Sequence, residues 1–328
     1  MSRTYRPPFT VTAGIVSQVA AIAESLGRLG AVQGKALRLR RINRIRSVRG
    51  SLAIEGNTLS EAQITAILDG KPVIAPPREV LEARNALAAY EGLPRWKPAH
   101  EPHLLAAHAC LMTGLADDAG HYRRGGVGVM QGQQVVHMAP PASRVPTLMK
   151  NLLRWLADTD QHPLIASSVF HYEFEFIHPF SDGNGRMGRL WQTLILSRWN
   201  PLFAHVPVES RVHAQQAGYY AALNESTQRS DCGVFVEFML AAIAESLREA
   251  TSAEMSAETP VDVSVEKAVR TPDLMLALLR RQPELTLTEV ARAVGKSVRT
   301  VERAAAQLQA QNRLRFEGPK KGGQWRVL

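Results

Sequence analysis

Cysteine is scarce in this chain, with only Cys110 and Cys232 among 328 residues. Two cysteines so far apart exclude a disulfide framework and a cysteine-based zinc site. Long apolar runs are also missing, because no stretch reaches the roughly 18–20 residues that span a bilayer. The first residues, MSRTYRPPFTVTAG, lack the apolar core of a signal peptide. We therefore expect a cytoplasmic protein, and a hydrophobic content of 45% with 21% charged residues is ordinary for a soluble chain.

Positive charge is concentrated towards the two ends of the chain. The formal net charge is +9, and the first fifty residues hold ten basic residues but one acid. Residues 270–328 hold twelve basic and five acidic residues, so the middle of the chain is acidic. A basic patch can bind nucleic acid, a polyphosphate or an acidic partner. For the basic helix that we expect over residues 34–49, we favour packing against the acidic middle of the chain.

The most distinctive feature is the run HPFSDGNGRMGR at residues 178–189. Apolar spacing over 163–177 and 190–199 predicts a helix on either side, so the run is a loop that ends at a helix N-terminus. A helix N-terminus presents unpaired N–H groups that attract phosphate. Gly183 and Gly185 allow the backbone to approach an anion closely. The run therefore has the design of an anion-binding loop.

The side chains of this run fit phosphoryl or nucleotidyl transfer. Arg186 and Arg189 are three residues apart, so their guanidinium groups share one helix face and suit a polyphosphate. Asp182 is a hard oxygen ligand for Mg²⁺, and His178 takes up a proton near neutral pH. Each residue alone has an ordinary structural explanation, but their joint occurrence favours chemistry. His171 stands outside any HExxH-type arrangement, and we interpret it as a packing or hydrogen-bonding residue.

The run fills every position of the HPFx(D/E)GNGRxxR signature of Fic-domain proteins, and the resemblance extends over roughly residues 5–245. It implies an α-helical enzyme that moves AMP from ATP to a hydroxyl side chain of a protein. It also implies that His178 deprotonates this hydroxyl and that Asp182 holds Mg²⁺ against the α- and β-phosphates. The implied nucleotide-binding residues form an anion hole and grip the outer phosphates: Gly183, Asn184, Gly185, Arg186, Gly188 and Arg189.

A second signal lies upstream, in the segment Ser51-Leu52-Ala53-Ile54-Glu55-Gly56. Locally it is a helical turn that Gly56 ends. On this basis alone Glu55 is a solvated carboxylate, although it is poorly placed against the helix dipole. The segment resembles the (S/T)xxxE(G/N) inhibitory motif of Fic proteins. That resemblance implies that Glu55 pairs with Arg189, occupies the γ-phosphate subsite and holds ATP unproductively; a role in removing AMP stays open.

Within residues 126–141, Val127 and Val129 alternate with glycine and methionine, a pattern that is typical of a β-hairpin. A surface hairpin without further function is the simplest interpretation. The resemblance implies a flap that docks the target chain by strand pairing. Its expected docking positions are Val127, Gly128, Val129 and Val136.

Tyr219 and Tyr220 resemble a family segment close to the nucleotide. Two adjacent tyrosines cannot share one helix face, so at most one contacts adenine. We assign that contact to Tyr220, with core packing an equally open alternative.

The C-terminal part predicts a separate module. Residues 250–269 are small, polar and acidic, which is typical of a linker. Beyond them we expect helices over 273–280, 289–294 (capped by Thr288) and 298–311, followed by a hairpin. This order resembles a winged helix-turn-helix domain. Its candidate DNA-contacting residues are Arg299, Arg303 and Lys320, and docking of a protein is equally open.

The sequence thus predicts a mostly α fold with a small hairpin flap. The predicted divisions are an N-terminal helical region with the inhibitory motif (1–95), a Fic core (96–249), a linker (250–269) and a winged helix-turn-helix domain (270–328). The predicted function is an autoinhibited protein AMP transferase that uses ATP and Mg²⁺, with self-modification and a homodimer left open. The alternatives are transfer of another nucleotide, removal of AMP, or a DNA-binding regulator whose Fic core only senses nucleotide.

Overall fold

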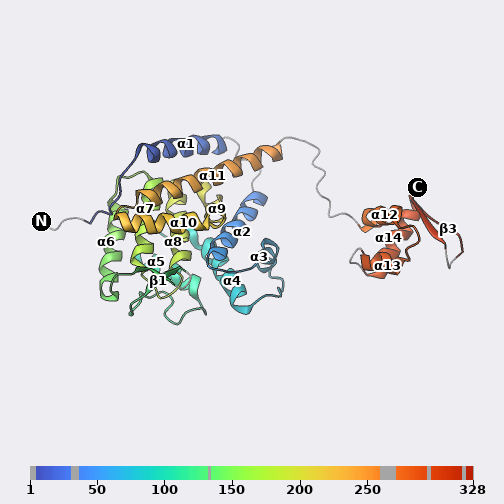
Figure 1. Cartoon of the computed structure of the whole chain (residues 1–328), viewed down its shortest axis with the longest axis horizontal. Coiled ribbons are helices and arrows are strands. Elements are labelled where there is room, and N and C mark those ends of the chain that lie inside the picture. The colour runs from blue at the N-terminus through green and yellow to red at the C-terminus, as the bar shows by residue number, and fades with distance from the viewer. Residues whose placement is uncertain are drawn as a thin grey trace. The chain divides into compact units, whose positions relative to one another are not determined.

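A computed structural model describes residues 5–30, 37–131, 134–258, 271–293, 297–319 and 323–327. The chain divides into two compact units, Met1–Ala257 and Glu258–Leu328 (Figure 1). Among the described residues, no helix has both the length and the apolar character that crossing a bilayer requires.

The first unit is built almost entirely from helices, as the sequence predicts. Its α-helices are α1 (Ala13–Gly30), α2 (Leu37–Ile54), α3 (Glu61–Leu68), α4 (Pro77–Gly92), α5 (Glu101–Met112), α6 (Val145–Asp158), α7 (Pro163–Ile177), α8 (Asn184–Trp199), α9 (Val208–Ala214), α10 (Gln216–Arg229) and α11 (Gly233–Glu258). Three short 3₁₀ turns join them: η1 (Leu93–Arg95), η2 (Ala142–Arg144) and η3 (Pro201–His205).

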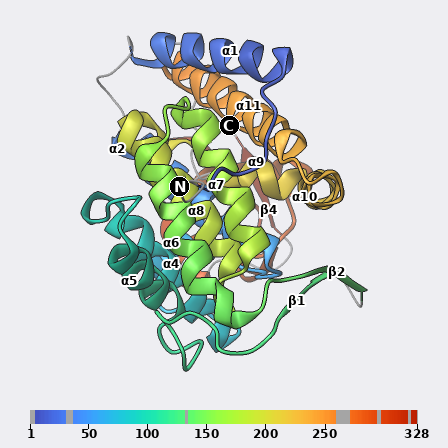
Figure 2. The ribbon, with the colours of Figure 1, turned by 90° about the vertical axis from the view of Figure 1, so that its left-hand side faces the viewer.

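Helices α7 and α8 pack against each other at the centre of this unit, with the other helices around them (Figure 2). Both helices are buried along most of their length, and Phe170, Phe174 and Trp191 are fully buried. Helix α8 also carries buried polar side chains, among them Arg186, Arg189 and Gln192. The loop between α7 and α8 is therefore held between two rigid, buried elements.

Helix α2 is one continuous helix that carries both the arginine cluster and Ser51. Its arginines pair with acidic side chains of α3 and α4 and of the turn after α3. Arg44 lies 3.3 Å from Glu91, and Arg41 pairs with Asp69. The expected packing of this basic helix against the acidic middle of the chain is confirmed for these arginines. Gly56, with φ at +87°, follows the helix end as predicted.

The predicted hairpin is present as strands β1 (Gly128–Gln131) and β2 (Gln134–Met138). The strands pair antiparallel, with Gly128 opposite Met138 and Val129 opposite His137, and a bulge follows Val129. The hairpin projects from the helical body (Figure 2). Its expected tip, residues 132–133, lies outside the described residues.

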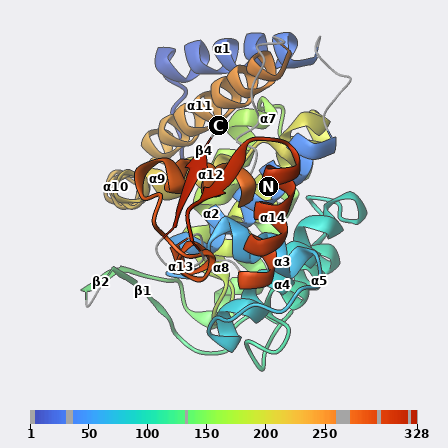
Figure 3. The same ribbon diagram turned by 90° about the vertical axis from the view of Figure 1, so that its right-hand side faces the viewer.

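The second unit contains α12 (Thr271–Arg281), α13 (Leu287–Ala293), α14 (Val298–Ala310) and the antiparallel strands β3 (Leu314–Glu317) and β4 (Gln324–Val327) (Figure 3). Its small core contains Met275, Leu279, Val290, Val301 and Leu308. The order of elements is the predicted one.

Two expectations for this part of the chain need correction. The cap of α13 is Thr286 rather than Thr288, because Thr286 and Glu289 exchange side-chain-to-backbone hydrogen bonds in a capping box. Helix α11 continues to Glu258, so the first part of the predicted linker is helical. Its alanine, glutamate and methionine residues are strong helix formers. Residues 259–270 and Lys320 lie outside the described residues.

Candidate active site

His178 is the first residue of the loop between α7 and α8, and its backbone is left-handed, with φ at 50°. This conformation is unfavourable for a residue with a side chain and persists only where the surroundings hold it. The His178 N–H donates to the Phe174 carbonyl at 2.9 Å, which ends α7. The Arg123 Nε donates to the His178 carbonyl at 2.7 Å. These bonds hold the backbone from which the imidazole extends.

Arg123 is itself almost completely buried and ties the loop to the base of the hairpin. Besides His178, its guanidinium donates to the carbonyls of Gly125, Pro140 and Ile177. Buried guanidinium groups are stable only with such complete pairing. One side chain therefore links the end of α7 to both ends of the hairpin segment.

The loop is shaped from within by Asn184. Its side-chain oxygen accepts from the Phe180 N–H and its amide donates to the Phe180 carbonyl, both at 2.9 Å. The side chain predicted to line an anion hole is therefore engaged with the backbone of the loop. Asn184 can offer an anion its backbone amide, while its side chain sets the shape of the loop. Its part in nucleotide binding stays a prediction.

His108 on α5 contacts the loop through its ring and its Nε2. Its ring stacks on Phe180 with centroids 3.6 Å apart, and its Nδ1 accepts from the Gly120 N–H at 2.8 Å. The Nε2 must then carry the proton and donate to the Asp182 carbonyl, 3.0 Å away. Burial lowers the pKa of His108, which agrees with this neutral ring.

Asp182 presents a half-exposed carboxylate beside the N-terminus of α8. One oxygen accepts from the Gly183 N–H at 2.6 Å and lies 3.2 Å from the Arg186 guanidinium. The other oxygen is 3.4 Å from Arg78, which the sequence analysis did not identify. No cluster of three metal-ligating side chains is found in the described part of the chain. The residues fit a Mg²⁺ ion that is held by one carboxylate together with substrate phosphates.

Arg186 is buried and takes part in a closed ring of alternating charges. Glu82 lies 3.8 Å from Arg186 and 3.4 Å from Arg78, and Asp182 contacts both arginines. Arg78 and Glu82 come from α4, about a hundred residues before the loop. No local pattern in the sequence identifies them, because their role depends on how α4 packs.

The first turn of α8 is closely approached by another acid, Glu55. A Cβ at Gly185 would lie 2.4 Å from the Glu55 Oε1. The Glu55 carboxylate therefore occupies the space that a side chain at residue 185 would fill. The N-terminus of a helix carries partial positive charge and unpaired N–H groups. Glu55 therefore lies where the loop is designed to attract an anion.

Glu55 also pairs with Arg189, as the sequence predicts. Its Oε1 lies 2.6 Å from the guanidinium, which is almost completely buried. Two further bonds connect Arg189 to Ser51, from Nε to the hydroxyl at 3.1 Å and from a terminal nitrogen to the carbonyl at 3.0 Å. Burial opposes the charge of Arg189, but the adjacent Glu55 carboxylate outweighs it and raises the Arg189 pKa.

Gly188 allows α8 to pack closely against α7, and its part in nucleotide binding stays a prediction. A Cβ there would lie 2.9 Å from both Glu175 and His171 on α7. His171 is a hydrogen-bonding residue, as predicted: its Nδ1 lies 2.7 Å from the Gln192 side-chain oxygen and its Nε2 3.1 Å from the Tyr219 hydroxyl.

The two adjacent tyrosines on α10 differ in burial. Tyr219 is fully buried and belongs to the core. Tyr220 is half-buried, and its ring lies edge-on to that of Tyr219 with centroids 5.3 Å apart. Burial, followed by the charge of Glu55, raises the Tyr220 pKa. A contact of Tyr220 with adenine stays a prediction.

Comparison with known proteins identifies the family. Residues 98–196 match the family model described as Fic/DOC family. The crystal structure of a Fic family protein from Desulfovibrio desulfuricans G20 is 44% identical, with a TM-score of 0.75 over 99% of this chain and 98% of that chain. The chain belongs to the Fic family. The Fic match spans α5 to α8 and so contains the loop and both arginines.

Curated Fic relatives are more distant and much longer. The chain is 28% identical over 204 residues to "Protein adenylyltransferase Fic" of Nematostella vectensis, covering 58% of this chain and 44% of that protein. It is 33% identical over 189 residues to "Protein adenylyltransferase fic-1" of Caenorhabditis briggsae, covering 53% of this chain and 35% of that protein. The alignments thus span less than half of either relative.

The folded chain brings most of the predicted Fic site together in the first unit. The signature loop, the first turn of α8 and the segment from Ser51 to Glu55 meet in one place. Arg299 and Arg303 belong to the second unit, where both are exposed on α14. Arg123 joins the hairpin residues to the loop. The only sign of this role in the sequence is that Arg123 lies just before the hairpin.

Proposed function

We propose that this Fic protein transfers AMP from ATP to a hydroxyl side chain of a protein. The observation that carries this proposal is the position of Glu55. Its carboxylate lies against Gly185 in the first turn of α8 and pairs with Arg189, so an anionic group already uses the place that suits a phosphate. The names of the curated relatives support the same activity.

In the proposed reaction the target hydroxyl oxygen attacks the α-phosphorus of ATP. A bond forms between these atoms, and the bond from the α-phosphorus to the oxygen bridging to the β-phosphate breaks. Pyrophosphate leaves with that oxygen, and the hydroxyl proton passes to the His178 imidazole. The left-handed backbone at His178 and its bond from Arg123 hold the base in place, which is the positional contribution expected of such a site.

The phosphates would be bound by the first turn of α8 and by its two arginines. The amides that follow Gly183, together with Arg186 and Arg189, supply donors in a largely buried surface. Asp182 would hold Mg²⁺, which when bound neutralises charge on the phosphates. Donors that are already oriented stabilise the charge that develops on the leaving pyrophosphate.

We further propose that Glu55 makes the enzyme autoinhibited. A γ-phosphate on Arg189 would have to displace the Glu55 carboxylate, and charge-assisted bonds to a buried guanidinium are strong competitors. ATP that binds without this contact would place its α-phosphorus away from His178. Glu55 is about one-third exposed, so it can move without unfolding the surrounding core.

The target chain would dock on the hairpin. Strands β1 and β2 form a sheet of two strands, so each has a free edge in the described structure. An exposed edge pairs with an extended peptide through its backbone groups. The backbone bond from Ala139 to Val127 anchors the hairpin close to Pro140, which Arg123 links to His178.

The test uses ATP labelled at either the α- or the γ-phosphate, incubated with the Glu55→Gly variant and a cell lysate. AMP transfer places the α-label on protein and never the γ-label, and His178→Ala abolishes it. The same experiment with labelled UTP and GTP shows whether the chain transfers AMP or another nucleotide. Label from the γ-phosphate that the variant adds beyond the lysate alone, or added α-label that survives His178→Ala, would sink the proposal.

A second function is proposed for the unit Glu258–Leu328, as a winged helix-turn-helix domain that contacts DNA phosphates. Arg299 and Arg303 are exposed one turn apart on α14, on the face away from the small core. Reversing both charges would weaken DNA retention in a salt-dependent way. In the regulator alternative, His178→Ala leaves DNA binding and its response to nucleotide intact, and Glu55→Gly transfers no AMP.

A further inference from the structure

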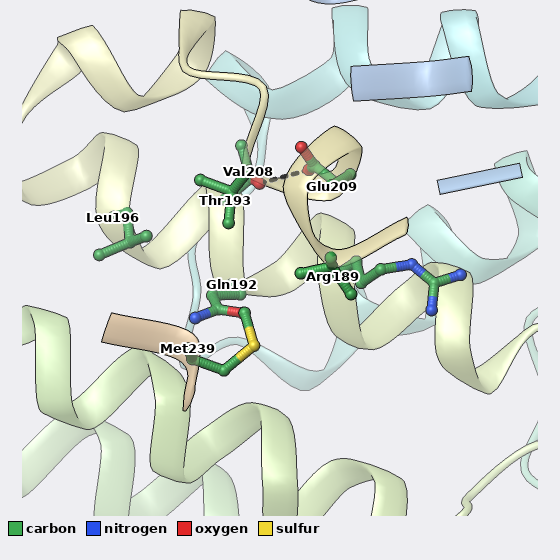
Figure 4. Close-up of a pocket in the computed structure, with 8 residues that line it drawn as sticks. Arg189, Gln192, Thr193, Leu196, Val208, Glu209 and Met239 are labelled. Atoms are coloured by element: carbon green, nitrogen blue, oxygen red, sulfur yellow. Dashed lines mark hydrogen bonds between the residues drawn. The ribbon is translucent and has the colours of Figure 1, made fainter. Parts of the chain in front are cut away.

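The two arginines near the start of α8 are each paired with an acidic residue from another part of the chain. Arg189 pairs with Glu55. Figure 4 shows its guanidinium turned away from Glu209 and from the small cavity that its stem lines. Arg186 lies 3.8 Å from Glu82 on α4. The structure therefore holds both cationic groups of the proposed phosphate site against carboxylates that the loop does not supply.

Glu82 is held against Arg186 by partners of its own. Its Oε2 accepts from the Asn57 Nδ2 at 2.9 Å, and its Oε1 lies 3.4 Å from the Arg78 Nε. Asn57 is buried, and its Nδ2 also donates to the Glu79 carbonyl at 3.3 Å. A carboxylate that is mostly buried is stable only when it is paired. Glu82 keeps two partners, Asn57 and Arg78, if Arg186 turns away from it.

Arg186 is less completely paired than the acids around it. Its terminal nitrogens lie 3.8 Å from Glu82 and 3.2 Å from Asp182. Its Nε is buried and has no hydrogen-bond partner within the described structure. A buried donor without an acceptor is costly, and a separation of 3.8 Å is too long for a hydrogen bond. A stronger acceptor, such as a phosphate, can therefore take Arg186 from Glu82.

We propose that Glu82 is a second inhibitory carboxylate, which competes with the nucleotide for Arg186 as Glu55 competes for Arg189. Only 6% of the Arg186 side chain is exposed, so its guanidinium must turn from Glu82 to meet a phosphate. This inference rests on the proposed function, in which both arginines bind phosphates. Because Arg189 takes the γ-phosphate there, Arg186 is left for a phosphate that ADP and ATP share. Glu82 thus lowers the affinity for ADP as well as for ATP.

The test is the affinity for ADP, measured by isothermal titration calorimetry on the full chain. Glu55→Gly is the parent, so that Glu55 is absent from every comparison. Glu82→Gln keeps an oxygen that accepts from Asn57 but removes the charge that faces Arg186, and we expect ADP to bind about fivefold more tightly. Glu82→Asp, which withdraws the carboxylate by one methylene, gives a smaller gain and serves if Glu82→Gln does not fold. A purely structural counterion of Arg186 would give no gain in either variant.

Glu79→Gln is the matched control, because it removes the same charge from the same helix. Glu79 accepts from the Thr58 N–H and hydroxyl at 2.7 and 2.9 Å, and it pairs with no arginine among the described residues. We expect its ADP affinity to equal that of the parent. An equal gain in Glu79→Gln, or unchanged or weaker ADP binding in the folded Glu82 variants, would overturn the inference. Failure of Glu55→Gly to transfer AMP, with the gain in ADP affinity intact, would overturn the proposed function alone.

Discussion

Glu55 and Arg189 meet at 2.6 Å although 134 positions separate them in the chain. The contact depends on the docking of α2 against α9, because Ser51 and Glu55 lie in and just beyond the last turn of α2. The Arg46 carbonyl accepts from the Ser210 hydroxyl at 2.9 Å, at the start of this interface. In the proposed autoinhibition, the strength of inhibition would therefore depend on helix packing as well as on one ion pair.

Gly50→Ala tests that packing. A Cβ at residue 50 would lie 2.5 Å from the Ser210 backbone nitrogen, which cannot turn aside as a side chain can. We expect a loss of about 1–3 kcal/mol in the free energy of unfolding, measured in urea, and faster AMP transfer than in wild type. Gly27→Ala in α1 is the control: its Cβ has nothing within 4 Å, so it stabilises by about 0.5–1 kcal/mol. Unchanged stability of Gly50→Ala would show that α2 tolerates displacement from α9.

Gly185→Ala tests whether the carboxylate occupies the first turn of α8. The new methyl group overlaps Glu55 Oε1, and it also lies 3.0 Å from Arg189. We expect a destabilisation of about 1–3 kcal/mol that is smaller when Glu55 is already glycine. Thermal unfolding of the two single variants and the double variant gives this coupling. Strictly additive effects would mean that the carboxylate does not use the space at Gly185.

Arg123→Lys separates hydrogen-bond geometry from charge. Lysine keeps the positive charge but cannot reach the four carbonyls that the guanidinium contacts. We expect a loss of about 2–4 kcal/mol in stability and slower AMP transfer in the Glu55→Gly background. Urea unfolding and α-label incorporation measure the two effects. Transfer at the full rate would show that His178 does not need this support.

Acid stability is expected to depend on Glu175. Burial disfavours its charged form, but the hydrogen-bonding His171 and the charges of His171, His178 and Arg189 outweigh burial and hold the Glu175 pKa below its ordinary value of 4.5. The unfolded chain then binds this proton more tightly than the folded chain does. The stabilisation is complete above about pH 4.5 and is lost as the pH falls through the lower folded pKa. Glu175→Gln should show a shallower loss of stability between about pH 6 and pH 3, followed by circular dichroism in urea.

Local chemistry explains which features the sequence could predict. The loop 178–189 and the segment around Glu55 can each be recognised from a short run of consecutive residues. The predicted contact of Glu55 with Arg189 is confirmed. The hairpin and the C-terminal elements follow from alternation and capping. Their roles in docking a target or DNA stay predictions, since contacts with absent partners leave no trace in a single chain.

Other features depend on tertiary packing and have no local pattern in the sequence. The Asn184 side chain shapes the loop, and Gly188 admits His171 and Glu175 on α7. The helical start of the predicted linker shows that a polar composition does not prevent a preceding helix from continuing.

The most direct test of the account is the intact mass of the purified chain after incubation with Mg²⁺ and ATP, for wild type, Glu55→Gly and the double variant Glu55→Gly with His178→Ala. We expect Glu55→Gly to gain the mass of AMP on itself or on an added protein target, wild type to gain little, and the double variant to gain nothing. Equal modification of wild type and Glu55→Gly would contradict autoinhibition. Modification of the double variant would contradict the role of His178.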